Sequence, residues 1–154
     1  MSIKLLSDEQ KQVVYSIEDG DNIFVTGSAG TGKSYLLQYL KKNYVESGLH
    51  ITASTGIAAV NIGGQTIHSW SGIGLANLPA EQIIKNLFSL KLTRLRRKLK
   101  LAQILAIDEI SMVSAKVFDL LNDVLKAVKQ NDKPFGGMQI ILFGDFFQLP
   151  PVDN

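Results

Sequence analysis

Short apolar runs and amphipathic segments alternate along this 154-residue chain, and the alternation predicts its fold. Four runs have the composition of buried strands, at residues 22–26, 49–53, 104–107 and 138–143. The run 104–107 is apolar at every position, which is typical of a parallel sheet covered on both faces. Helical segments are expected between the runs, at residues 8–17, 35–47, 55–60, 80–90, 92–99 and 114–129. We therefore predict an α/β fold, a mostly parallel sheet with helices on both faces.

The segment between the first predicted strand and the next helix matches the phosphate-loop pattern G-x-x-x-x-G-K-[ST]. Its residues are Gly27, Ser28, Ala29, Gly30, Thr31, Gly32, Lys33 and Ser34. The glycines let backbone N–H groups point at phosphate oxygens, and the helix N-terminus adds about half a positive charge. Lys33 is placed to reach the β- and γ-phosphates, and the Ser34 hydroxyl to coordinate Mg²⁺. The strand before the loop and the helix after it favour a P-loop NTPase over a chance glycine-rich turn.

Carboxylates follow the apolar run 104–107 directly. Asp108 at a strand end can face the phosphate loop and hold Mg²⁺, and Glu109 is placed to activate the attacking water. The alternative is a helix-capping aspartate beside a solvated glutamate. Gln148 follows the run 138–143, where a neutral amide can sense the γ-phosphate, but an ordinary loop glutamine fits the spacing equally well.

Polar and small residues form a second candidate site. Thr55, His68, Ser69 and Trp70 can contact a nucleic-acid backbone through hydroxyl and imidazole groups, with Trp70 stacking on a base. The alternative is structural, because a single Trp is more often part of a core and His68 can make a structural hydrogen bond.

Positive charge is concentrated in residues 85–100. This segment holds seven of the sixteen basic residues and no acidic one, so the rest of the chain carries nine basic and fourteen acidic residues, a net charge of −5. The basic residues are Lys85, Lys91, Arg94, Arg96, Arg97, Lys98 and Lys100. Leucines recur at helical spacing within the segment, so it predicts an amphipathic helix with a cationic face. That face indicates either a polyanionic partner or simply a solvated surface.

The amino-acid composition excludes several kinds of site and membrane segments. The chain has no cysteine, which excludes disulfides, zinc-thiolate sites and thiol catalysis and favours an intracellular protein. Its N-terminus lacks the features of a signal peptide, and no apolar stretch approaches about 20 residues, so no membrane segment is expected.

Together these residues resemble the petite-integration-frequency (PIF) family of DNA helicases in superfamily 1, over nearly the whole chain. The motifs that carry the resemblance are GSAGTGKS (27–34), TASTGIAA (52–59), IGGQTIHS (62–69), DEISM (108–112) and PFGG (134–137) leading to GDFFQLPPV (144–152). The resemblance implies a RecA-like motor domain that uses ATP and Mg²⁺ and binds single-stranded DNA. Such helicases move 5′ to 3′ and serve repair, recombination and telomere maintenance.

The resemblance also assigns roles to residues. Gln10 matches the glutamine that reads adenine, and Gln148 matches the γ-phosphate sensor. Thr55, His68 and Ser69 fall in the DNA-contacting motifs, and Trp70 stands where an aromatic residue, often Phe, is usual.

The family continues beyond the third helicase motif, whereas this sequence stops at Asn154. We therefore expect residues 1–154 to be an N-terminal RecA-like lobe whose second RecA-like domain, with its arginine finger, is missing, and to show weak or no ATPase and no unwinding. Two alternatives stay open: a non-catalytic nucleotide-dependent DNA-binding module, and a RecD-like or other P-loop ATPase subunit. ATPase restored by a cognate C-terminal fragment would argue against the first, and single-strand stimulation with 5′-to-3′ polarity against the second.

Overall fold

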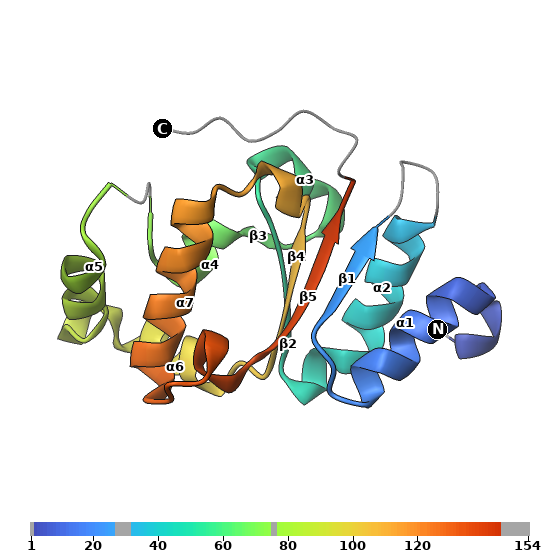
Figure 1. The fold of residues 1–154 in the computed structure, drawn as a ribbon, viewed down its shortest axis with the longest axis horizontal. Coiled ribbons are helices and arrows are strands. Elements are labelled where there is room, and N and C mark those ends of the chain that lie inside the picture. The colour runs from blue at the N-terminus through green and yellow to red at the C-terminus, as the bar shows by residue number, and fades with distance from the viewer. Residues whose placement is uncertain (1, 27–31, 75–76, 146–154) are drawn as a thin grey trace.

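A five-stranded parallel sheet forms the centre of the molecule (Figure 1). The computed structural model describes residues 2–26, 32–74 and 77–145. The strands are β1 (Ile23–Thr26), β2 (Leu49–Ala53), β3 (Gln65–Thr66), β4 (Ile104–Asp108) and β5 (Gln139–Gly144), in the spatial order β1-β5-β4-β2-β3. The predicted α/β class with a parallel sheet is confirmed.

Helices cover both faces of this sheet. The longer helices are α1 (Asp8–Glu18), α2 (Lys33–Tyr44), α3 (Gly56–Ile62), α5 (Ala80–Leu87), α6 (Thr93–Leu101) and α7 (Ala115–Lys129), and α4 (Ile67–Ser71) is a single short turn of helix. Helices α1 and α2 pack on one face, while α4 to α7 pack on the other (Figure 1).

Side chains of the central strands alternate between these two layers, as the period of two in a strand requires. In β4, Leu105 and Ile107 pack with α4 to α7, whereas Ile104 and Ala106 pack with α1 and α2. Every residue of β4 is buried, which explains why its sequence is an unbroken apolar run up to Asp108.

Local signals account for most helix ends. Ser7 and Gln10 form the reciprocal capping box at the start of α1, and Ser114 caps α7 by accepting a hydrogen bond from the Val117 N–H.

Differences from the expected elements are confined to short pieces. The helix expected at 80–90 ends at Leu87, and the chain then turns through a 3₁₀ segment (Leu90–Leu92) into α6. The edge strand β3 has only two residues, too few to produce a periodic pattern.

Of the helices in the described part of the chain, none has the length and apolar character needed to cross a membrane.

Candidate nucleotide site

The carboxyl ends of neighbouring strands meet at one edge of the sheet. Thr26 at the end of β1 is in register with Gly144 of β5, and Ala53 at the end of β2 is in register with Asp108 of β4. Ligands of open α/β sheets bind at this edge. The topology therefore brings the sequence after β1 close to the carboxylates at the end of β4.

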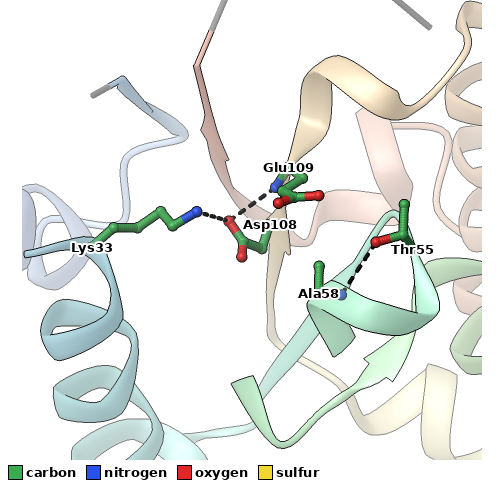
Figure 2. Close-up of polar contacts among 5 residues, drawn as sticks. All are labelled: Lys33, Thr55, Ala58, Asp108 and Glu109. Atoms are coloured by element: carbon green, nitrogen blue, oxygen red, sulfur yellow. Dashed lines mark hydrogen bonds and ion pairs between the residues drawn. The ribbon is translucent and has the colours of Figure 1, made fainter. Parts of the chain in front are cut away.

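An ion pair joins these segments. The Lys33 Nζ, in the first turn of α2, lies 3.0 Å from the Asp108 Oδ1 (Figure 2). The Asp108 side chain is 5% exposed and that of Lys33 is 36% exposed, so the ammonium group lies on the solvent side of the pair. The same Oδ1 accepts a hydrogen bond from the Glu109 backbone N–H at 2.9 Å. This carboxylate is thus held in place from both sides.

Glu109 has an unusual backbone conformation. Its φ of 55° and ψ of 49° lie in the left-handed region, which costs a residue with a Cβ about 1–2 kcal/mol. The conformation turns the chain from β4 into the 3₁₀ segment Ile110–Met112. Strained non-glycine residues of this kind cluster at functional sites. The sequence signal for Glu109 is its position after the strand, and nothing in the pattern reveals the positive φ.

A hollow of about 270 Å³ lies beside the ion pair and between α1, β1 and α2. Its apolar wall includes Val13, Phe24 and Leu36, and its polar groups include Gln10 and Lys33. An apolar wall with a few convergent polar groups is the usual construction of a small-molecule site.

Gln10 links α1 to the start of α2. Its Nε2 donates to the Gly32 carbonyl at 2.9 Å, and its Oε1 accepts from the Ser7 N–H at 2.8 Å. An amide has a further N–H and a further lone pair, so one donor and one acceptor position remain for a ligand. Gly32 has a φ of 83°, and a Cβ there would lie 2.5 Å from the Gln10 Nε2. The positive φ favours glycine here, and a Cβ would also displace the Gln10 amide from its hydrogen bond to the Gly32 carbonyl.

Three of the four candidate DNA residues are accessible at the surface, and the fourth, Trp70, is buried. Thr55 caps α3, since its Oγ1 accepts from the Ala58 N–H at 3.2 Å (Figure 2). His68 and Ser69 lie on α4, which begins where β3 ends. Helices α3 and α4 therefore start at the same sheet edge as the Asp108 site. Ser69 is exposed and Thr55 and His68 are partly exposed, so all three remain accessible to a ligand.

Trp70 is a correction to the sequence interpretation. Its side chain is only 1% exposed and packs in the core formed by α4 to α7, so no ring face is presented to a base. The His50 ring lies 5.6 Å from it, and Lys98 both donates to the Trp70 carbonyl at 2.9 Å and lies over the ring. Burial lowers the pKa of His50, with a smaller contribution from Lys98, and burial also lowers the pKa of Lys98. The stronger of the two interpretations of a single Trp, a core position, is the one that the structure supports.

Two serines near the carboxylates stand inside the TASTGIAA and DEISM motifs, but the sequence analysis assigned neither of them a role. The Ser54 N–H donates to the Asp108 carbonyl at 3.1 Å, and Ser111 lies in the 3₁₀ segment after Glu109. The hydroxyl oxygens of both serines are buried and have no hydrogen-bond partner among the described residues. Serine is too common at such positions for a sequence pattern to single these two out.

Several predicted site residues lie outside the described part of the chain. They are Gly27, Ser28, Ala29, Gly30, Thr31 and Gln148. Ser34 is described and exposed, in the first turn of α2. Within the described ranges, no group of three or more His, Asp or Glu side chains is arranged to hold a metal ion by itself.

Comparison with known proteins agrees with this geometry. The family model described as PIF1-like helicase matches residues 5–154. The ATP-dependent DNA helicase RRM3 of Saccharomyces cerevisiae is 48% identical over 96% of this chain, which covers 21% of that protein. This chain spans about a fifth of the length of the curated relatives it matches.

Solved structures show the same relationship. The crystal structure of Pif1 helicase from Candida albicans superposes with a TM-score of 0.90 at 43% identity, covering 99% of this chain and 35% of that one. Pif1 helicase from Bacteroides, in complex with ADP-AlF3 and single-stranded DNA, superposes with a TM-score of 0.80 at 40% identity, covering 97% of this chain and 34% of that one. The sequence resemblance is confirmed, and the chain belongs to the PIF1-like helicase family.

Proposed function

We propose that this chain is the N-terminal RecA-like, ATP-binding lobe of an ATP-dependent DNA helicase. The observation that carries the proposal is the Lys33–Asp108 ion pair at the rim of the hollow between α1 and α2. A cation from the first turn of α2 and a carboxylate from the end of β4, beside a hollow with an apolar wall, are parts that ATP binding and phosphoryl transfer require. Relatives named ATP-dependent DNA helicases supply independent support.

The residues have separate roles in this proposal. Lys33 leaves Asp108 and binds the β- and γ-phosphates, while Gln10 offers its remaining donor and acceptor to the adenine edge. Asp108 and the Ser34 hydroxyl would hold Mg²⁺, since hard cations prefer such oxygen ligands. The ion, when bound, neutralises charge on the phosphates. Glu109 would orient and deprotonate the attacking water, and Gln148 would sense the γ-phosphate.

Single-stranded DNA is the proposed partner at the same edge of the sheet. Thr55, His68 and Ser69 are accessible and lie at or near the starts of α3 and α4, at the sheet edge that carries Asp108. Their hydroxyl and imidazole groups suit phosphate contacts, which position a strand without reading its sequence. The Bacteroides relative in complex with single-stranded DNA supports this assignment.

Hydrolysis by this chain is expected to be slow. Lys33 is the one cation among the described residues that line the hollow. Phosphoryl-transfer enzymes that lack a transition-state arginine are slower by about 10³–10⁵. We propose that a second RecA-like domain supplies that arginine, so adding a cognate C-terminal fragment should raise the rate of phosphate release.

Fluorescent-ATP binding tests the proposal directly. Affinity and phosphate release are measured with and without Mg²⁺ and oligo-dT, for the parent chain and for Lys33→Ala. We expect the parent to bind and Lys33→Ala to lose binding, because the phosphates lose their cationic partner. Lys42→Ala, an exposed lysine in the last turn of the same helix, is the matched control and should bind like the parent. Equal affinity of parent and Lys33→Ala for ATP–Mg²⁺ would refute the assignment.

A further inference from the structure

The cations of residues 85–100 divide into two classes. Arg96 and Lys98 are engaged with the protein itself. The Arg96 guanidinium donates to the Leu87 carbonyl at 2.8 Å and lies over the Phe88 ring, and Lys98 is bound to Trp70 as described above. These two side chains join α6 to neighbouring segments and explain part of the basic composition structurally.

The other five cations lie on the surface, Lys85 on α5 and four on α6 or just before it. Lys91, Arg94, Arg97 and Lys100, here called the basic stripe, recur every third residue and are all exposed. Arg94, Arg97 and Lys100 lie on α6, where residues three apart are neighbours on the helix surface and each step advances about 4.5 Å. Lys91 precedes them in the 3₁₀ segment Leu90–Leu92. No carboxylate of the described residues pairs with any of the four within 4.0 Å. Like charges at this spacing destabilise a helix by about 0.2–0.5 kcal/mol per pair, and the helix dipole offsets part of this only at Lys100, in the last turn of α6.

A second hollow adjoins the basic stripe. It has a volume of about 210 Å³, and its lining includes Arg96, Arg97 and Lys100, together with Phe88 and with Gln130, which directly follows α7. None of its described lining residues is acidic. Phe88 is 47% exposed, so an apolar ring edge accompanies the cations. A concave surface with this composition favours an anionic ligand that also carries apolar surface.

The basic stripe is remote from the nucleotide site. Helix α6 ends at Leu101, and β4 then begins at Ile104, so the end of α6 lies at the amino edge of the parallel sheet. The Lys33–Asp108 pair lies at the carboxyl edge. In Figure 1 α6 lies at the bottom of the molecule and α3 at the top. The two surfaces are therefore separate sites.

We propose that the basic stripe and its hollow bind the phosphodiester backbone of nucleic acid, as a contact separate from the sheet edge that carries Thr55 and Ser69. A phosphodiester backbone presents regularly repeated negative charges, which suits a regularly repeated row of cations. Exposed aromatic carbon beside cations is the composition of sequence-tolerant single-strand sites. The proposal does not depend on nucleotide binding at Lys33.

Salt-dependent binding measures this contact. The affinity for a fluorescein-labelled 20-nucleotide oligo-dT, and for a duplex of the same length, is measured from 50 to 300 mM NaCl. The parent is compared with the triple variant Arg94→Gln, Arg97→Gln, Lys100→Gln. Glutamine has nearly the helix propensity of arginine and lysine, and none of the three side chains has a described hydrogen bond, so the fold should be retained. The plot of log K against log salt has a negative slope. Removing three phosphate contacts should make that slope less steep by about 2 for oligo-dT and should weaken binding at least about tenfold.

The control variant removes the same charge elsewhere. Lys4→Gln, Lys11→Gln, Lys42→Gln lowers the net charge equally, on the α1 and α2 side of the sheet, and should keep the parent slope. Fluorescent-ATP affinity, measured in parallel, should be the same for all three proteins. The proposal is overturned if the stripe variant keeps the parent slope, if the control loses as much, or if the parent binds ATP but no DNA at 50 mM NaCl. Poly-glutamate is a probe for an acidic protein partner. If it binds at the basic stripe and DNA does not displace it, the stripe is a site for an acidic protein, and the proposal is also overturned.

Discussion

The Lys33–Asp108 ion pair makes an unusual prediction for Asp108→Asn. In the structure the Lys33 ammonium is bound by a carboxylate at 3.0 Å, and a phosphate must compete with that carboxylate. Asparagine keeps the shape of the side chain and can still accept from the Glu109 N–H, but it removes the competing charge. Nucleotide without a metal ion should therefore bind the variant more tightly than the parent.

The size of the effect follows from the geometry of the pair. Two unit charges 3.0 Å apart attract by about 5.5 kcal/mol at an effective dielectric constant of about 20. Because the Lys33 side chain is 36% exposed, water screens the pair, and desolvation of Asp108 offsets more of the attraction. A net strength of about 1–2 kcal/mol remains, which corresponds to an affinity gain of about 5- to 30-fold.

The assay is equilibrium binding of a fluorescent ADP in EDTA and again in excess Mg²⁺. In EDTA we expect Asp108→Asn to bind about 5- to 30-fold more tightly than the parent. In Mg²⁺ the order should reverse, because the metal loses a carboxylate ligand. Glu109→Gln serves as the matched control. It also neutralises a carboxylate at the end of β4, but that carboxylate makes no ion pair with the described residues, so affinity in EDTA should stay near the parent value.

Equal or weaker binding of Asp108→Asn in EDTA, with an unchanged unfolding temperature, would refute the idea that the ion pair competes with phosphate. A gain of equal size in Glu109→Gln would also refute it, because general relief of negative charge near the pocket would then be sufficient.

Three further predictions concern single residues. Glu109→Asn should raise the unfolding temperature by about 2–4 °C, because asparagine tolerates the left-handed conformation better, while any phosphate release is lost; an unchanged or lower unfolding temperature would contradict the strain. Burial lowers the pKa of His50, so the unfolded chain binds more protons, and acidification through pH 6.5 should lower the stability of the fold. In a series of thermal melts from pH 7.5 to 5.5, the unfolding temperature should decrease less in His50→Gln than in the parent. Equal decreases in the two proteins would argue against this role of His50. Trp70→Phe should lower the free energy of unfolding in a urea melt by less than about 2 kcal/mol, since the buried indole N–H has no described partner to lose. The variant should bind oligo-dT like the parent. Tenfold weaker DNA binding at unchanged stability would show that Trp70 contributes to the DNA site.

The layer structure could be predicted from the sequence because burial leaves a strong pattern. The run 104–107 is apolar throughout since β4 is covered on both faces, and the Ser7–Gln10 capping box marks the start of α1. The strand β3 and the short helix α4 could not be predicted, because two and five residues are too few to establish a period. Their positions are set by packing against β2, which the local sequence does not encode.

The candidate site shows the same division. Carboxylates that directly follow an apolar run stand out in a sequence, so the pattern alone identifies Asp108 and Glu109 as candidates. The positive φ of Glu109 and the buried hydroxyl group of Ser111 depend on how the chain turns after β4, and that of Ser54 depends on how the chain leaves β2; no residue preference marks them. Trp70 failed as a candidate for the opposite reason, because an aromatic ring that packs in a core and one that stacks on a base have the same sequence signature.

Two short connections join the proposed ATP and DNA residues. The Ser54 N–H donates to the Asp108 carbonyl at 3.1 Å, and the next residue, Thr55, caps α3. At the other end of α3, the Gly63 carbonyl accepts a hydrogen bond from the Lys41 Nζ of α2 at 3.0 Å. Helix α3 is therefore held at one end by the strand that carries Asp108 and at the other by the helix that carries Lys33. The segment that carries Thr55 is thus hydrogen-bonded to both elements of the Lys33–Asp108 pair, through a backbone bond to β4 and a side-chain bond from α2.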